Sequence, residues 1–286
     1  MSLDIIGAIL NKEGIKYSHL SAVQGGDISE AYQVQALDSA YFIKVNSTEV
    51  AEDMFDAEAD GLSLIQKSGQ IAVPKVIKCG LHNSRAYLIL EFIQTGTKSN
   101  HAMAKFGRQL ANMHLQTQYS FGLDTQNFIG KLPQSNAKHL NWISFYIGER
   151  LEPQFKLALD NGLLQAHDIP PSANIDSVLD SLMPEIKPSL LHGDLWGGNF
   201  LIDAQGDAYL IDPAVYYGHS EVDIAMSRLF GGFSPSFYNA YFEIHPKEIH
   251  FEARRDIYQL YYLLVHLNLF GSSYYGSVKR IMERYF

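Results

Sequence analysis

The chain has 286 residues, of which 47% are hydrophobic and 19% charged, and its formal net charge at pH 7 is -9. This composition is ordinary for a globular protein and excludes fibrous and disordered classes, while the negative charge argues against nucleic acid or an anionic membrane as the main partner, because both attract a surplus of Lys and Arg. The one cysteine, Cys79, excludes an intramolecular disulfide, and the sequence shows no leader-like or membrane-spanning run, so we expect a cytoplasmic location.

Short strand-like runs dominate the first ninety residues, several of them bounded by Gly, Asp or Asn. One helical pattern interrupts them at 49–68, where Met54, Leu62 and Ile65 recur at helical spacing and Gly69 is placed as a terminator. We therefore predict an antiparallel sheet with one helix. The predicted strands are 19–24, 31–37, 40–45, 75–79 and 86–92.

After residue 95 the pattern changes to long amphipathic helices, which are predicted at 99–117, 140–161 and 251–270. We place a boundary there, so that residues 1–94 form one lobe and residues 95–286 a larger, mostly helical lobe. The fold class predicted from this order of elements is α+β.

A β-hairpin is predicted inside the helical half, with strands at 199–202 and 208–211 around a polar turn. Asn199 opens this hairpin and Asp212 closes it, so the two side chains should be neighbours that can share one ion. Oxygen ligands of this kind suit Mg²⁺, which takes its remaining oxygens from water and substrate phosphates. Asp194, five residues before Asn199, is then free to accept a proton from a hydroxyl nucleophile.

Two charged residues of the first lobe lie on apolar faces. Lys44 follows Phe42 on one face of its strand, and Glu58 lies on the apolar stripe of the predicted helix. Each would be costly to bury alone, and an ion pair between them resolves both costs. In kinases such a pair holds the lysine against the phosphates of ATP.

Two backbone segments are candidates for nucleotide contacts. Gly25 and Gly26 join two predicted strands and could lay amides over phosphates, although the segment matches no established phosphate-loop motif and a plain turn is the alternative. Glu91, Phe92 and Ile93 end the last strand before the boundary, where a kinase hinge binds adenine through main-chain groups.

Three further residues are candidates for supporting the site. Two of them, His192 and Trp196, lie two residues from Asp194, and the third, Asp223, lies further along the chain. His192 is predicted to brace the loop, since no other histidine stands at metal-ligand spacing. Trp196 is either a core residue or an aromatic platform for a sugar ring. Asp223 begins a predicted helix, which it could cap, or it could tie down the loop around Asp194.

The octapeptide His-Gly-Asp-Leu-Trp-Gly-Gly-Asn at 192–199, followed by Asp-Pro-Ala at 212–214, resembles the signature of the fructosamine (ketosamine) kinase family. Weaker resemblances extend over nearly the whole chain, and the wider relatives are the aminoglycoside and choline kinases. The resemblance implies a two-lobed protein-kinase-like fold, in which a small antiparallel sheet lobe binds the nucleotide and the helical lobe carries the catalytic loop and the acceptor site.

The same resemblance implies site roles and a reaction. Asp194 would be the base, Asn199 and Asp212 would hold Mg²⁺, Lys44 and Glu58 would set the ATP phosphates, and residues 91–93 would form the hinge. Phosphate would be placed on a hydroxyl of a ketosamine, free or protein-bound, whose product can break down and release the amine, a repair of glycation. Because Asp212 is followed by Pro-Ala and only a short segment leads to Asp223, control by activation-loop phosphorylation is not expected.

Two other functions stay open at this point. One is an aminoglycoside- or choline-type small-molecule kinase, which a panel of acceptors would separate from a ketosamine kinase. The other is a nucleotide-binding pseudokinase, against which the joint presence of Lys44, Asp194, Asn199 and Asp212 argues. The sequence sets neither the preferred sugar nor the oligomeric state.

Overall fold

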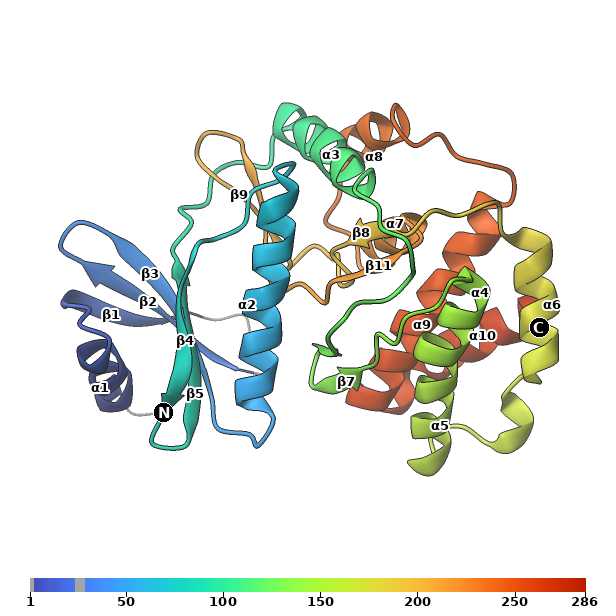
Figure 1. Ribbon diagram of the computed structural model, residues 1–286, viewed down its shortest axis with the longest axis horizontal. Coiled ribbons are helices and arrows are strands. Elements are labelled where there is room, and N and C mark those ends of the chain that lie inside the picture. The colour runs from blue at the N-terminus through green and yellow to red at the C-terminus, as the bar shows by residue number, and fades with distance from the viewer. Residues whose placement is uncertain (1–2, 24–28) are drawn as a thin grey trace.

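The computed structural model describes residues 3–23 and 29–286, and it places an antiparallel sheet on one side and a larger group of helices on the other (Figure 1). The sheet has five strands in the order β1-β2-β3-β5-β4. Every neighbouring pair in it is antiparallel, as predicted. The strands are β1 (Tyr17–Val23), β2 (Glu30–Ala36), β3 (Ala40–Asn46), β4 (Val76–His82) and β5 (Arg85–Glu91).

A helix packs on each face of the sheet, because alternate side chains of a strand point to opposite faces. On one face, Ile43 and Val45 of β3 pack with α1 (Leu3–Lys12), a helix that the sequence analysis did not predict. On the other face, Phe42 belongs to the cluster that includes the apolar side of α2 (Ala51–Ser68). Lys44 shares the face of Phe42, so its side chain is directed toward α2.

The connection between the sheet and the helical half runs along the β-hairpin of the second half. The amide of Gly96 donates to the carbonyl of Ile202 over 2.7 Å, and a Cβ at Gly96 would collide with the backbone oxygen of Asp203. Glycine is therefore required at this crossing. Helix α3 (Asn100–His114) then begins at Ser99, whose Oγ caps the amide of Ala102.

The remaining chain is mostly helical, with three small two-stranded sheets. The predicted helix at 140–161 is divided by a π-helical turn at Ile147–Leu151. The helices are α4 (Trp142–Tyr146), α5 (Glu152–Asp160), α6 (Ser172–Leu182), α7 (Glu221–Leu229), α8 (Pro235–Phe242), α9 (Phe251–Phe270) and α10 (Tyr275–Tyr285). The strands are β6 (Asn127–Ile129), β7 (Leu132–Gln134), β8 (Ser189–Leu191), β9 (Phe200–Ile202), β10 (Ala208–Leu210) and β11 (Tyr216–Gly218).

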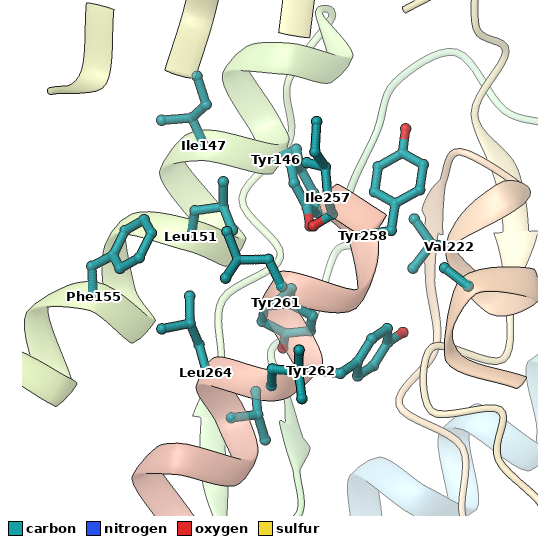
Figure 2. Packing of buried hydrophobic residues seen from close by; sticks show 14 of the residues in the cluster. Tyr146, Ile147, Leu151, Phe155, Val222, Ile257, Tyr258, Tyr261, Tyr262 and Leu264 are labelled. Carbon is teal, nitrogen blue, oxygen red and sulfur yellow. The ribbon is translucent and has the colours of Figure 1, made fainter. Parts of the chain in front are cut away.

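Helix α9 is the centre of the larger core. Figure 2 shows its buried residues, among them Ile257, Tyr261 and Leu264, packed between the helical segment 146–155 on one side and Val222 of α7 on the other. A fully buried large apolar side chain contributes about 1.5–3 kcal/mol relative to exposure. This packing fixes α7 and α9, which hold the loop at residues 192–199 through Asp223 and Tyr262.

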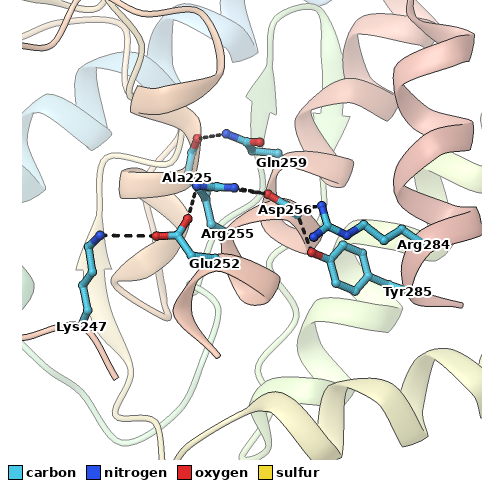
Figure 3. Close-up of polar contacts among 8 residues, drawn as sticks. All are labelled: Ala225, Lys247, Glu252, Arg255, Asp256, Gln259, Arg284 and Tyr285. Carbon is cyan, nitrogen blue, oxygen red and sulfur yellow. Dashed lines mark hydrogen bonds and ion pairs between the residues drawn. The ribbon is translucent and has the colours of Figure 1, made fainter. Parts of the chain in front are cut away.

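Polar contacts hold the C-terminal helix to α9 (Figure 3). The carboxylate of Asp256 accepts hydrogen bonds from Arg255 of its own helix, and from Arg284 and Tyr285 of α10. One carboxylate thus joins the end of the chain to the central helix. Within residues 3–23 and 29–286, no helix combines the length and apolarity that crossing a membrane requires.

Candidate active site

The segment from His192 to Asn199 forms a loop between β8 and β9, and a glycine shapes its beginning. Gly193 has a φ of 82°, in the left-handed region, and a Cβ there would overlap the carbonyl oxygen of Ala214. The amide of Ala214 donates to the carbonyl of His192 over 2.9 Å. The loop therefore lies directly against the segment that follows the β9–β10 hairpin.

Asp223 holds this loop through its backbone. Its fully buried carboxylate accepts from the amides of His192 over 2.7 Å and Gly193 over 2.9 Å. Burial alone would raise the pKa of Asp223, but His114 and the amide donors more than offset that effect and hold this pKa below its usual value. Of the two roles considered for Asp223, it ties down the loop and does not cap the helix, since Ser220 is the N-cap.

His192 contacts backbone groups of the loop and of the end of the hairpin. Its Nε2 lies 2.9 Å from the carbonyl of Ile211, and its Nδ1 lies 3.2 Å from the amide of Asp194, so a neutral ring that carries its proton on Nε2 satisfies both contacts. Burial lowers the pKa of His192, which favours this neutral form.

Asp194 and Asn199 face each other across the loop. The Nδ2 of Asn199 donates to the carboxylate of Asp194 over 3.1 Å and to its backbone oxygen over 2.9 Å. Desolvation raises the pKa of Asp194 to about 7, although the hydrogen bond from Asn199 acts in the opposite direction. A carboxylate with a pKa near neutrality is suited to accept a proton from a hydroxyl group.

Lys44 joins the two halves of the site. Its ammonium lies 2.7 and 2.9 Å from the two carboxylate oxygens of Glu58, so the predicted ion pair is present, and it also contacts the carboxylate of Asp212. Asp212 has a φ of 53°, a conformation that is uncommon for residues other than glycine. The ammonium of Lys44, on strand β3, thus contacts side chains from helix α2 and from the end of the hairpin.

Asn199 and Asp212 lie at the open end of the hairpin, where Asn199 Nδ2 is 3.5 Å from the backbone oxygen of Asp212. Because that Nδ2 is directed to Asp194, the amide oxygen of Asn199 and the carboxylate of Asp212 are the oxygen donors. This donor set fits Mg²⁺. Among the described residues no group of three His, Cys, Asp or Glu side chains could hold a metal by itself.

Trp196 is 40% exposed and is therefore not a core residue. Its ring covers Gly198, where a Cβ would overlap the indole carbons. Gly197 in turn approaches the backbone of Gly231, whose oxygen would lie 2.9 Å from an added Cβ. Close contacts thus explain the two glycines after Trp196. The indole itself is partly exposed to solvent, on the same loop as Asp194.

Of the predicted hinge residues, Glu91 ends β5 and Phe92 and Ile93 follow it, and their amides differ in hydrogen bonding. The amide of Glu91 donates to the carbonyl of Lys75 over 2.9 Å, and that of Phe92 to Ala40 over 3.1 Å. In the part of the chain that the structure describes, no acceptor pairs with the amide of Ile93. Adenine binding by this amide stays a prediction. Gly25 and Gly26 lie outside the described residues.

Sequence reasoning missed two residues that hold the loop from a distance. His114 of α3 lies 3.1 Å from Asp223 and 2.8 Å from the hydroxyl of Tyr241. Tyr262 of α9 donates to the carbonyl of Gly193 over 2.7 Å. A histidine or tyrosine within an apolar helical pattern gives no local signal of a partner about 70 or more residues away in the sequence.

Coupling between Lys44 and Glu58 gives a first prediction. Lys44→Met and Glu58→Gln are each expected to impair turnover, and the double variant should lose much less than the sum, because both changes disrupt one ion pair. A double-mutant cycle on kcat/KM for ATP measures this coupling. Full additivity would mean that the pair does not act as a unit.

The pKa of Asp194 gives a second prediction. Because protonation removes the base, kcat/KM should rise with pH through a midpoint of about 7 and then level off. A pH series of initial rates with buffer controls measures the midpoint. A flat profile between about pH 5.5 and 8.5 would contradict the assignment of Asp194 as a titrating base.

Comparison with known proteins shows to which family the chain belongs. The family model described as fructosamine kinase matches residues 5–286. The chain belongs to the fructosamine kinase family. A probable ketoamine kinase of Enterococcus faecium is 41% identical over 265 residues, covering 92% of this chain and 94% of the relative. The chloroplastic protein-ribulosamine 3-kinase of Arabidopsis thaliana is 39% identical and covers 100% and 88%.

Solved structures agree with the family assignment. A fructosamine-3-kinase-like protein of Haemophilus somnus 129PT superposes on this chain with a TM-score of 0.87 at 28% sequence identity. The match covers 99% of this chain and 96% of that structure. The aminoglycoside phosphotransferase APH(4)-Ia superposes with a TM-score of 0.65 at 18% identity, which shows the fold alone. The sequence-based predictions of the family, of a two-lobed kinase-like fold and of a ketosamine kinase are confirmed.

Proposed function

We propose that the chain is an ATP- and Mg²⁺-dependent kinase that phosphorylates a hydroxyl group of an amine-linked sugar. The observation that carries this proposal is the convergence of Lys44, Glu58 and Asp212 beside the loop of Asp194 and Asn199. This is the arrangement that phosphoryl transfer needs, since the chemistry is mostly positioning and charge neutralisation. The names of the relatives supply the acceptor class.

In this proposal each residue has one task. Asp194 accepts the proton of the acceptor hydroxyl while the oxygen forms a bond to the terminal phosphorus of ATP and the bond between that phosphorus and ADP breaks. Lys44, oriented by Glu58, binds phosphate oxygens. Asn199 and Asp212 hold Mg²⁺, which when bound neutralises phosphate charge.

Lys44 contacts Asp212 as well as Glu58, so the lysine and the proposed Mg²⁺ ligand lie close together. Phosphate oxygens bound to Lys44 would therefore lie next to the ion that Asp212 would hold.

Trp196 is proposed to carry the sugar ring. Its exposed indole follows Asp194 by two residues, so a sugar stacked on it would have hydroxyl groups near the base. The phosphorylated ketosamine can then break down and release the amine, so the role would be the repair of glycated amines. A cytoplasmic location is part of this proposal and rests on the sequence alone.

Product analysis tests the proposal. Purified protein, MgATP and deoxyfructosyl-lysine should give a product with one added phosphoryl group on a sugar hydroxyl oxygen, identified by mass spectrometry and phosphorus NMR. Phosphate on the amine, or ATP hydrolysis without a phosphorylated sugar, would contradict it.

Metal dependence is a third prediction. Removal of Mg²⁺ with EDTA should abolish turnover, and Asp212→Ala should raise the Mg²⁺ concentration for half-maximal rate and lower kcat, because one of two protein ligands is lost. Titration of the rate with Mg²⁺ measures both effects. Asp207→Ala, at the far end of the same hairpin, is the matched control, and equal effects of the two changes would mean that Asp212 is not a ligand.

A further inference from the structure

Four aromatic rings form a cluster where α7 and α9 end, which we call the aromatic face. Phe230 follows α7, His266 and Phe270 belong to the last turns of α9, and Tyr274 lies in the 3₁₀ turn after it. The ring centroids of Phe230 and His266 are 4.6 Å apart, and those of His266 with Phe270 and Tyr274 are 5.4 and 5.2 Å apart. The rings therefore form one continuous surface.

This surface is open to solvent. Phe230 is 42% exposed and Phe270 is 52% exposed, although the nearby side of α9 is buried in the core. Phe230 and Phe270 each contact the ring of His266, so the two exposed rings belong to one patch. A contiguous exposed apolar patch can serve as a place where a ligand or partner binds.

The aromatic face is joined to the loop of Asp194 by a close backbone contact. Phe230 directly precedes Gly231 and Gly232, and a Cβ on Gly232 would lie 2.7 Å from the Cα of Gly197. In the sequence, Trp196 directly precedes Gly197. Trp196 and Phe230, both exposed, are therefore each a chain neighbour of a glycine at this contact.

A second connection runs through α9. Tyr262 donates to the carbonyl of Gly193 over 2.7 Å, and His266, one turn later, donates from Nδ1 to the carbonyl of Tyr262 over 2.8 Å. The aromatic face therefore lies one helical turn from the residue that holds the catalytic loop.

The chemistry of this face suits an alkyl chain that carries an ammonium group. Burial lowers the pKa of His266, so its ring is neutral at neutral pH, and none of the four side chains bears a charge there. The faces of such rings attract alkylated ammonium groups and pack well against methylene groups. The nitrogen of a ketosamine is an alkylated ammonium that joins the sugar to its carrier chain.

We propose that the aromatic face is a subsite for the amine carrier of the substrate, so that the sugar stacks on Trp196 while the carrier's alkyl chain lies across Phe230 and Phe270. This inference rests on the proposed function. It adds that the enzyme distinguishes ketosamines by their carrier and favours those with a long alkyl chain, such as the side chain of lysine.

The experiment compares two acceptors that share one sugar, deoxyfructosyl-lysine and deoxyfructosyl-methylamine. The readout is the ratio of their kcat/KM values. Phe230→Ala and Phe270→Ala should each lower kcat/KM for the lysine adduct by about tenfold, mainly through KM, with a clearly smaller loss for the methylamine adduct. Tyr119→Ala, which removes a ring that is 87% exposed elsewhere, is the matched control and should leave the ratio unchanged.

The outcomes separate the two proposals. If the wild-type enzyme accepts both adducts and neither phenylalanine variant changes the ratio, the carrier subsite is wrong and the ketosamine kinase proposal stands. If the wild-type enzyme accepts neither these adducts nor any other ketosamine offered, both proposals fail. If sedimentation shows a dimer that Phe270→Ala dissociates without changing the ratio, the aromatic face is an interface between copies, and the subsite is again wrong.

Discussion

Replacing Asp194 by asparagine is expected to lower kcat by about two to four orders of magnitude, because an amide cannot accept the proton of the acceptor hydroxyl. The change should leave the loop in place. Asn199 donates to Asp194 through Nδ2, and an amide oxygen at residue 194 can still accept that bond. Steady-state rates together with ATP binding by calorimetry measure the effect.

The matched control is Asp207→Asn, which changes an exposed carboxylate in the turn of the adjacent hairpin. It should retain nearly wild-type kcat. If Asp194→Asn also retained it, Asp194 would have no part in proton transfer; if it lost ATP binding along with turnover, the residue would be required for the nucleotide site.

Arg150→Lys is expected to have the largest effect on stability, lowering the free energy of unfolding by about 3–5 kcal/mol, because several buried acceptors would lose their donors. The guanidinium is fully buried and donates to the backbone oxygens of Ser135 and Glu149 over 2.6 and 2.9 Å. It also donates to the side-chain oxygen of Asn136 over 2.7 Å and stacks on the ring of Tyr216 at 4.0 Å. A lysine cannot reproduce this planar set of donors, so buried acceptors would lose their partners.

Urea denaturation followed by tryptophan fluorescence measures the loss. Arg108→Lys is the control, because the ion pair of Arg108 with Glu243 is exposed and should change stability by no more than about 1 kcal/mol. Equal midpoints for the two variants would contradict a structural role for the buried guanidinium.

The parts of the site that the sequence predicted are those with a local signal. A lysine on an apolar strand face and a glutamate on an apolar helix stripe each required a partner, and Lys44 and Glu58 indeed pair. The polar turn at 203–207 predicted the hairpin, and the structure has this hairpin with Asn199 beside Asp212. In each case the inference needed only strand alternation, helical periodicity or a short return of the chain.

Other features depend on contacts between distant segments and left no such signal. His114 resembles any helical histidine, yet it lies beside Asp223, more than a hundred residues later. Arg150 is fully buried although arginines are rarely buried without a carboxylate partner, and nothing local in the sequence indicates its burial. The glycine pairs at 197–198 and 231–232 are explained only by close approach in three dimensions.

The boundary at residue 95 stays a prediction of domain organisation. The sheet ends at Glu91 and α3 begins at Asn100, but Gly96 is bonded to the hairpin of the second half, and Lys44 contacts Asp212. The two halves are therefore connected through the site itself. The roles of the hinge residues 91–93 are likewise predictions until a nucleotide complex is measured.

The measurement that tests the central claim most directly is a comparison of kcat/KM, with saturating MgATP, for deoxyfructosyl-lysine, kanamycin and choline. A ketosamine kinase predicts efficient turnover of the ketosamine and a kcat/KM at least about a hundredfold higher than for the other two, which corresponds to a difference of about 3 kcal/mol in transition-state binding. Efficient phosphorylation of kanamycin or choline, with no turnover of any ketosamine offered, would contradict the proposed acceptor while leaving the kinase fold intact.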